Sequence, residues 1–181
     1  MNKINVIDLD CTLLPYDSFR KLVKIELRKL NLYIWIISIL RILKVIQGYR
    51  YKQLLVLYWE NKYDKSFFYN YAKLIYKDLD KNILNIVSSK TDSNTKNILI
   101  SASPELYVKE LIVLLGWEGR GSYYKNKKFI NLYSKEKINW LIKNYPKNEV
   151  EYNFAISDSQ SDVQLLALFQ ESTLWIQNDN K

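Results

Sequence analysis

Short apolar runs that end at polar residues recur three times along the chain. They occupy residues 4–7, 97–100 and 152–156, and lead into Asp8, Ser101 and Ser157 respectively. Each run has the length and composition of a buried β-strand that opens into a polar loop. The second and third runs are followed by helical patterns, over residues 105–115 and 162–169. This alternation predicts an α/β protein with a Rossmann-like parallel sheet.

The first of these helical patterns has signals at both ends. Ser103 is the expected N-cap, Pro104 the first helical residue, and Gly116 the stop. Because ligands bind at the carboxyl ends of parallel strands, the three polar loops are expected to converge in one crevice.

Residues 16–87 have a different pattern, with long helical periodicities, a single glycine and no proline. We interpret this region as an inserted α-helical cap. The polar stretch 88–96 marks the return to the sheet, and Pro15 marks the exit from it. The predicted organisation is therefore a catalytic core made of residues 1–15 and 88–181, and a cap made of residues 16–87.

One cap segment, residues 32–46, is unusually apolar. It is shorter than the ~20 residues that span a bilayer, and it contains Arg41 and Lys44. We expect a buried cap helix. A helix lying on a membrane surface is the main alternative, because aromatic and aliphatic residues stand next to cations.

Charge and composition narrow the classes of function. The formal net charge is +8 and the pI is about 9.3, which favours anionic partners. The basic residues are dispersed, so no nucleic acid is expected. The absence of histidine excludes Ser-His-Asp triads and Cys/His zinc sites. The single cysteine, Cys11, excludes an internal disulfide, and with no secretory signal pattern we expect a cytoplasmic protein.

Two carboxylates, Asp8 and Asp10, follow the first strand two residues apart. Like charges this close repel, and a divalent cation is the simplest compensation. An all-oxygen site without histidine favours Mg²⁺. The same tripeptide recurs at Asp78 and Asp80, where the helical context favours exposure to solvent.

The chain resembles the haloacid dehalogenase-like (HAD) hydrolases, most closely the phosphoserine-phosphatase-like branch (subfamily IB) with a helical C1 cap. The first motif that carries the resemblance is Asp-x-Asp-x-Thr at residues 8–12. The resemblance implies that Asp8 attacks phosphorus, that Asp10 protonates the leaving oxygen and then activates water, and that Thr12 orients the loop. Carboxylates are chemically suited to both tasks. Cys11 stands where glycine is common.

Two further motifs concern the phosphoryl group. By resemblance, the Ser101 hydroxyl and the neighbouring amide of Ala102 hold its oxygens. A lysine then neutralises charge on the nucleophile and on the phosphoryl group. The spacing within the family's segment favours Lys137, with Lys135 as the fallback.

The last motif resembles the family's Gly-Asp-x-x-x-Asp element. It implies that Asp158 binds Mg²⁺ together with Asp8 and Asp10. Asp162 is expected to hold a metal-bound water or to anchor the lysine. Ser157 stands where glycine is usual.

The resulting hypothesis is a Mg²⁺-dependent phosphatase that acts on a small phosphorylated metabolite through an aspartyl-phosphate. Cap residues just past the first motif are candidates for contacting the substrate: Asp17, Ser18, Phe19 and Arg20. Two alternatives stay open. One is a phosphatidylglycerophosphate-type lipid phosphatase peripheral to the membrane, with membrane contact through the cap, and the other is a non-catalytic protein that binds a phosphorylated ligand.

Overall fold

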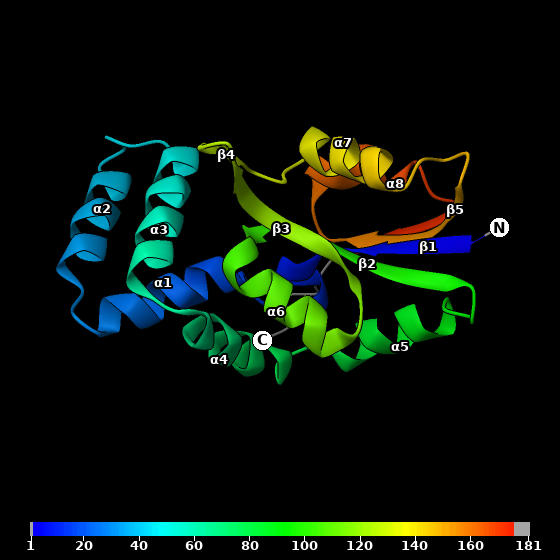
Figure 1. Ribbon diagram of the computed structural model, residues 1–181, viewed down its shortest axis with the longest axis horizontal. Helices are drawn as coiled ribbons and strands as arrows, with labels where there is room; N and C mark the ends of the chain where they lie inside the picture. Colours follow the sequence, from blue (N-terminus) through cyan, green and yellow to red (C-terminus); the bar gives the residue numbers. More distant parts are fainter. Residues whose placement is uncertain (1, 176–181) are drawn as a thin grey trace.

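Six strands form one mostly parallel sheet in the computed structural model, which describes residues 2–175 (Figure 1). The strand order is β4-β3-β2-β1-β5-β6, and only the β3–β4 pair is antiparallel. The strands are β1 (Asn2–Ile7), β2 (Thr95–Pro104), β3 (Glu118–Lys125), β4 (Lys128–Ile130), β5 (Val150–Ser157) and β6 (Glu171–Leu174). The chain passes from β1 to β2 on one side and later to β5 on the other. The carboxyl ends of these three strands therefore border the switch point where ligands bind in such sheets.

Helices cover both faces of the sheet, which explains why its central strands are almost continuously apolar. Ile4 and Val6 of β1 belong to one buried cluster, whereas Ile7 belongs to the other. Helices α7 and α8 cover the first cluster, and α5 and α6 the second (Figure 1). The predicted α/β fold class and the three predicted strands are confirmed.

The eight α-helices and two irregular turns of the described chain connect these strands. They are a π-type turn (Leu9–Leu13), α1 (Ser18–Arg28), α2 (Leu32–Ile42), α3 (Gly48–Lys62), α4 (Lys65–Tyr76), α5 (Lys81–Ser89), α6 (Glu105–Leu115), α7 (Lys135–Asn144), a 3₁₀ turn (Gln160–Asp162) and α8 (Val163–Leu166). Helices α1 to α3 lie beyond one end of the sheet, whereas α4 packs against α6 (Figure 1). The division of the chain into core and cap at residues 15 and 87 stays a prediction.

Three asparagines tie the central strands together. Asn5 of β1 donates to the side chain of Asn97 at 2.9 Å and accepts from Asn153 at 2.8 Å. Asn5 is fully buried, so an unpaired amide there would be costly, whereas this pairing fixes the register of the strands.

The expectation that residues 32–46 form a buried cap helix is wrong for most of the segment. In α2 only Ile34, Ile37 and Ser38 are buried, and the opposite side of the helix is exposed. The apolar side chains of α2 point to all sides of the helix, but α1 and α3 cover only one of these sides. No helix within residues 2–175 is long and apolar enough to cross a membrane.

The helix after β2 spans Glu105–Leu115, as the pattern predicts, but its predicted cap is wrong, because Pro104 occupies the N-cap position and no side chain caps the helix. Ser103 is not the cap because its hydroxyl bonds Asp10 instead. The pattern expected as a helix from residue 162 is divided between the 3₁₀ turn and the short α8.

Candidate active site

The loop after β1 places Asp8 and Asp10 at the sheet edge. The Asp8 amide donates to the Ile156 carbonyl of β5 at 3.0 Å, so the sheet pairing continues to the first carboxylate. Cys11 then adopts a left-handed conformation with φ of 56°. Glycine enters this region most easily, which gives a physical reason for the glycine usual at this position of the motif.

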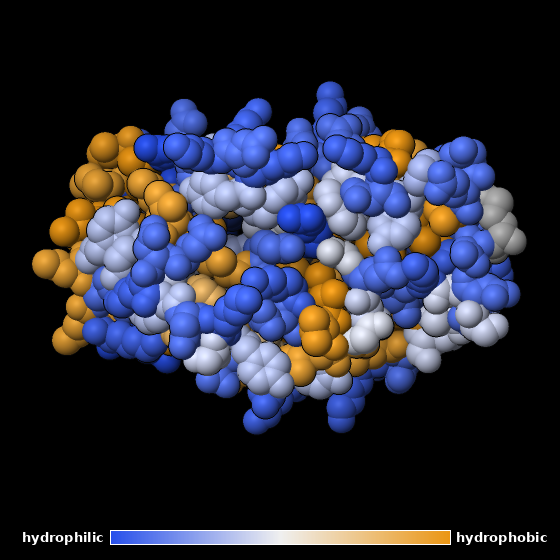
Figure 2. Space-filling model, viewed as in Figure 1, coloured by the Kyte–Doolittle hydropathy of each residue, from blue (hydrophilic) through white to orange (hydrophobic). Residues whose placement is uncertain are grey.

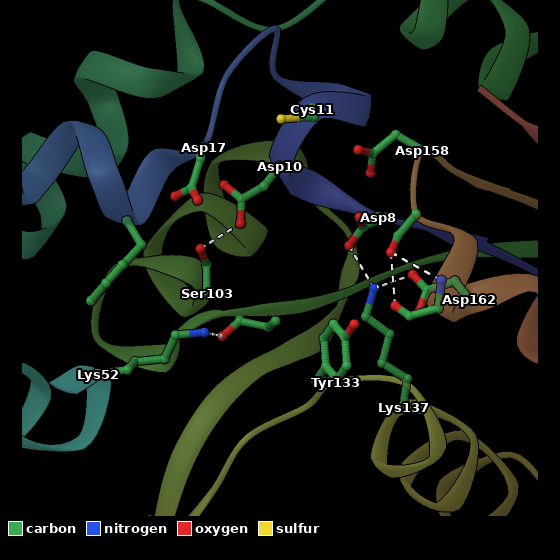
Figure 3. Close-up of a pocket in the computed structure, with 14 residues that line it drawn as sticks. Asp8, Asp10, Cys11, Asp17, Lys52, Ser103, Tyr133, Lys137, Asp158 and Asp162 are labelled. Carbon is green, nitrogen blue, oxygen red and sulfur yellow. Dashed lines mark hydrogen bonds and ion pairs between the residues drawn. The ribbon is translucent and has the colours of Figure 1, made fainter. Parts of the chain in front are cut away.

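Lys137 joins Asp8 and Asp162 in a buried network (Figure 3). Its Nζ lies 2.7 Å from Asp8 Oδ1 and 2.5 Å from Asp162 Oδ2. Lys137 is only 3% exposed, whereas Lys135 on the same helix points to solvent. The geometry therefore places Lys137, and not Lys135, against Asp8.

Burial and neighbouring charges shift the pKa values of this network in opposite directions. Burial raises the pKa of Asp8 to about 7, although the Lys137 charge opposes the shift. Burial alone would lower the pKa of Lys137, but Asp8 and Asp162 together raise it. Lys137 therefore stays charged, and the Asp8 carboxylate remains in an environment that does not fully compensate its negative charge.

Asp10 is held by serines from two other elements. Asp10 Oδ1 accepts from the backbone amide and hydroxyl of Ser18, at 2.7 and 2.5 Å, and Asp10 Oδ2 accepts from the Ser103 hydroxyl at 2.5 Å. The Ser18 hydroxyl also contacts Tyr107, which is fully buried. Burial raises the pKa of Asp10, and the serine hydrogen bonds lower it in part.

Ser101, which the resemblance assigned to phosphoryl oxygens, is fully buried. Its hydroxyl accepts from the Ser103 amide at 3.0 Å and donates to Asp10 at 3.4 Å. Ala102 and Ser103 line the cavity between the strand ends, whereas Ser101 does not. A phosphate-binding role for Ser101 stays a prediction.

Thr12 connects the first loop to the loop after β5. The Thr12 hydroxyl accepts from the Asp158 amide at 2.8 Å and donates to Asp158 Oδ1 at 3.2 Å. These bonds hold Asp158 at the side of the cavity where Asp8 lies (Figure 3). The resemblance implied that Thr12 orients its own loop. The observed hydrogen bonds connect Thr12 to the loop after β5, which contains Asp158.

A cavity of about 310 Å³ lies between the strand ends and is lined by Asp8, Asp10, Lys137 and Asp158. Its walls also include Asp17 and Phe19 of the α1 region, and Lys52 of α3. Of the other two substrate candidates, Ser18 is buried against Asp10, and Arg20 points to solvent, where it pairs with Asp17. Lys52 donates to the Ala102 carbonyl and to the Asn131 side chain, both at 3.2 Å.

Among residues 2–175, no three His, Cys, Asp or Glu side chains converge closely enough to form a metal site on their own. Asp8, Asp10 and Asp158 all line the cavity, but both carboxylate oxygens of Asp10 accept hydrogen bonds from serines, Oδ1 from Ser18 and Oδ2 from Ser103. Figure 3 shows the bond to Ser103. The predicted carboxylate set of Asp8, Asp10 and Asp158 is therefore not assembled as a cluster.

Several residues of the site were not found from the sequence. Lys52 comes from a helix with no motif, so no sequence signal distinguished it. Ser157 was noted only as a departure from glycine, yet its buried hydroxyl donates to Asp162 at 2.8 Å. Ser103 was assigned to a helix cap because a serine before proline is a common cap signal.

Comparisons with solved structures show the fold. No model of a known protein family matches the sequence, and no curated protein is similar to it. A protein of unknown function from Bordetella pertussis Tohama I superposes with a TM-score of 0.69 and 14% identity, over 94% of this chain and 89% of that one. A HAD family hydrolase from Salmonella enterica serovar Typhi superposes with a TM-score of 0.60 and 14% identity, over 93% of this chain and 60% of that one. A phosphoserine phosphatase, solved as a phospho-aspartyl intermediate analogue, superposes with a TM-score of 0.54 and 13% identity, over 94% of this chain and 85% of that one.

At this level of identity the likeness establishes the architecture. The chain has the HAD fold, with its mostly parallel six-stranded sheet and flanking helices.

Proposed function

We propose that this protein is a Mg²⁺-dependent phosphomonoester phosphatase that works through an aspartyl-phosphate on Asp8. The observation that carries the proposal is the buried contact between Asp8 and Lys137, with Asp162 holding the lysine from the other side. A carboxylate that a buried cation orients toward a cavity fits a nucleophile.

The proposed reaction has two displacements. The Asp8 oxygen that Lys137 does not hold attacks phosphorus, and the bond from phosphorus to the ester oxygen breaks. The leaving oxygen takes a proton from Asp10. Water then attacks the phosphorus of the aspartyl-phosphate and gives a proton to Asp10. The bond between phosphorus and the Asp8 oxygen breaks, so inorganic phosphate is released and Asp8 is restored. Throughout, Lys137 offsets negative charge on Asp8 and on the phosphoryl group.

Asp10 suits the acid and base steps. Its burial raises its pKa, which favours the protonated form needed to donate to a leaving oxygen. Ser18 and Ser103 hold its carboxyl group from two sides at the wall of the cavity.

Asp8 and Asp158 are the residues that would hold Mg²⁺. Two carboxylates are enough, because Mg²⁺ usually keeps several waters and takes further oxygens from the substrate phosphate. Asp162 Oδ1 is buried and has no hydrogen-bond partner among residues 2–175, so it offers an acceptor for a metal-bound water. When bound, Mg²⁺ supplies positive charge that keeps Asp8 ionised and offsets charge on phosphate oxygens.

The proposed substrate is a small phosphorylated metabolite. The cavity volume of about 310 Å³ suits a compact molecule. Asp17 and Lys52 place opposite charges in its wall, which favours a substrate with a polar leaving group, such as a phosphorylated amino acid or sugar, whose leaving group is the free amino acid or sugar.

The test is hydrolysis of para-nitrophenyl phosphate with and without Mg²⁺, followed by a panel of phosphomonoesters. We expect turnover that EDTA abolishes and Mg²⁺ restores. The panel includes phosphoserine, sugar phosphates and a short-chain lipid phosphate, so a preference for the last would select the lipid alternative. Absence of Mg²⁺-dependent turnover across the panel would leave only the non-catalytic binding protein.

Replacing Ser103 with alanine is expected to change the pH profile. The Ser103 hydrogen bond lowers the pKa of Asp10, so Ser103→Ala should raise it and keep the acid protonated to higher pH. The basic limb of kcat/KM should move upward by about one pH unit. Ser101→Ala is the comparison: if Ser101 binds the phosphoryl group, this variant should raise KM and leave that limb in place.

Lys52→Met is expected to weaken substrate binding. It removes a cation from the cavity wall but leaves the Asp8 network intact, so KM should rise about tenfold while kcat changes less. Arg50→Met is the matched control, since Arg50 lies on the same helix and points to solvent. An unchanged KM in Lys52→Met would contradict a substrate role for this lysine.

A further inference from the structure

Helix α2 presents a continuous apolar face to solvent. The exposed residues on this side recur at helical spacing, and Leu30 and Val45 extend the face at both ends. We define the α2 patch as Leu30, Leu32, Trp35, Ile36, Ile39, Ile42, Leu43 and Val45. Figure 2 shows apolar side chains gathered at the end of the molecule that carries α2.

Exposed apolar residues are concentrated in the α2 patch and are not scattered singly over the surface, as is usual. Within the described chain, nine of the eighteen exposed large hydrophobic residues lie between residues 30 and 45. Several are strongly exposed, with Leu32 at 72% and Ile42 at 77%. Contiguous apolar surface of this kind marks a site of interaction with a partner or a membrane.

The charges within the segment that carries the patch have a single sign. Between Glu26 and Glu60 the sequence contains six Lys or Arg residues and no Asp or Glu. Arg28 precedes the patch, and Arg41 and Lys44 lie at its other end, all exposed to solvent. An apolar face whose own segment carries only cations complements an anionic lipid bilayer, which is apolar inside and negatively charged at its headgroups.

A second copy of the chain fits the patch poorly. In a symmetric dimer the same residues would face each other, so Arg28, Arg41 and Lys44 of one copy would meet those of its partner. Like charges at the rim of an interface disfavour association.

Neighbouring elements connect the patch to the proposed active site. Helix α2 packs on α1 and α3, and Phe19 of α1 and Lys52 of α3 line the cavity. No helix of the described chain can span a bilayer, so contact would be at the surface. We propose that the α2 patch docks this protein on anionic membranes, with α2 lying in the plane of the lipid headgroups.

The test is sedimentation with vesicles of phosphatidylglycerol and phosphatidylcholine, compared with vesicles of phosphatidylcholine alone. We expect the wild-type protein to sediment with the anionic vesicles and to be released by high salt. Ile36→Ser/Ile39→Ser should weaken binding by about tenfold or more, because two side chains that enter the interface are lost. Val113→Ser/Ile142→Ser is the control, since both residues are exposed on other helices, and it should bind like the wild type.

A second pair of variants tests the charges. Arg28→Gln/Lys44→Gln should weaken binding to anionic vesicles by about tenfold or more, whereas Lys125→Gln/Lys127→Gln in the β3–β4 hairpin should not. Fluorescence gives an independent readout, because exposed Trp35 should shift to shorter wavelength on vesicles and Trp35→Phe should lose that shift.

Two results would overturn the proposal. One is equal recovery of the wild type and Ile36→Ser/Ile39→Ser with anionic vesicles. The other is a wild-type dimer in light scattering that this double variant converts to monomer, which would assign the patch to a second copy. Circular dichroism confirms that each variant folds. Because none of these readouts requires turnover, the result is independent of the proposed phosphatase activity.

Discussion

Asp8→Asn is expected to reduce Mg²⁺-dependent hydrolysis by about a thousandfold or more. Asparagine keeps the shape of the side chain and can still accept a hydrogen bond from Lys137. It lacks the carboxylate that would form the bond to phosphorus. Trapping with radiolabelled substrate in acid should show a phosphoenzyme in the wild type and none in the variant. Retained turnover would exclude Asp8 as the nucleophile.

Unfolding is not expected to explain this loss. Burial raises the pKa of Asp8 to about 7, which means that the fold disfavours the ionised carboxylate relative to the unfolded chain. A neutral amide removes that cost, so without metal Asp8→Asn should melt at or above the wild-type temperature near pH 8. Adding Mg²⁺ should raise the melting temperature of the wild type and have less effect on the variant.

The chain contains its own control for this substitution. Asp78 begins a second Asp-Leu-Asp, where its carboxylate accepts hydrogen bonds from Tyr16 and Lys21 near the surface. Asp78→Asn makes the same chemical change in the same tripeptide. It should keep full activity and cost less than about 1 kcal/mol of stability, since partly exposed ion pairs contribute little.

The strand ends could be predicted from the sequence because local patterns identify them. Asp8 and Asp158 stand far apart in the chain, yet each lies directly past the end of a buried apolar strand. Parallel strands bring such ends to one edge regardless of the intervening sequence. The same reasoning missed β3, whose glycines weaken its strand pattern. Gly119 is needed there, because a side chain at this position would collide with the Leu99 backbone.

The inserted helices could not be placed from the sequence. Periodicity shows which positions of a helix are apolar, but not which side finds a partner. In α2 both sides are apolar, and packing with α1 and α3 covers only the side of Ile34 and Ile37. For the same reason the position of Lys52 in the cavity wall depends on how α3 packs, which local pattern does not determine.

Lys137→Met is expected to abolish activity and to destabilise the fold. The substitution leaves Asp8 and Asp162 buried without the cation between them. Removing one member of a buried ion network costs about 3–5 kcal/mol, because the remaining charges lose their compensation. Urea unfolding measures this loss, and turnover of para-nitrophenyl phosphate should fall by about a thousandfold.

The destabilisation should grow with pH. Without Lys137 the pKa of Asp8 rises further above its value of 3.8 in the unfolded chain, so the folded variant binds more protons than the unfolded chain. Stability then falls as pH increases through this range, and the difference from wild type should be larger at pH 8 than at pH 5.5. Lys135→Met, on the exposed side of the same helix, should stay within about 0.5 kcal/mol of wild type at both pH values. Equal losses in the two variants would mean that the buried network does not depend on Lys137.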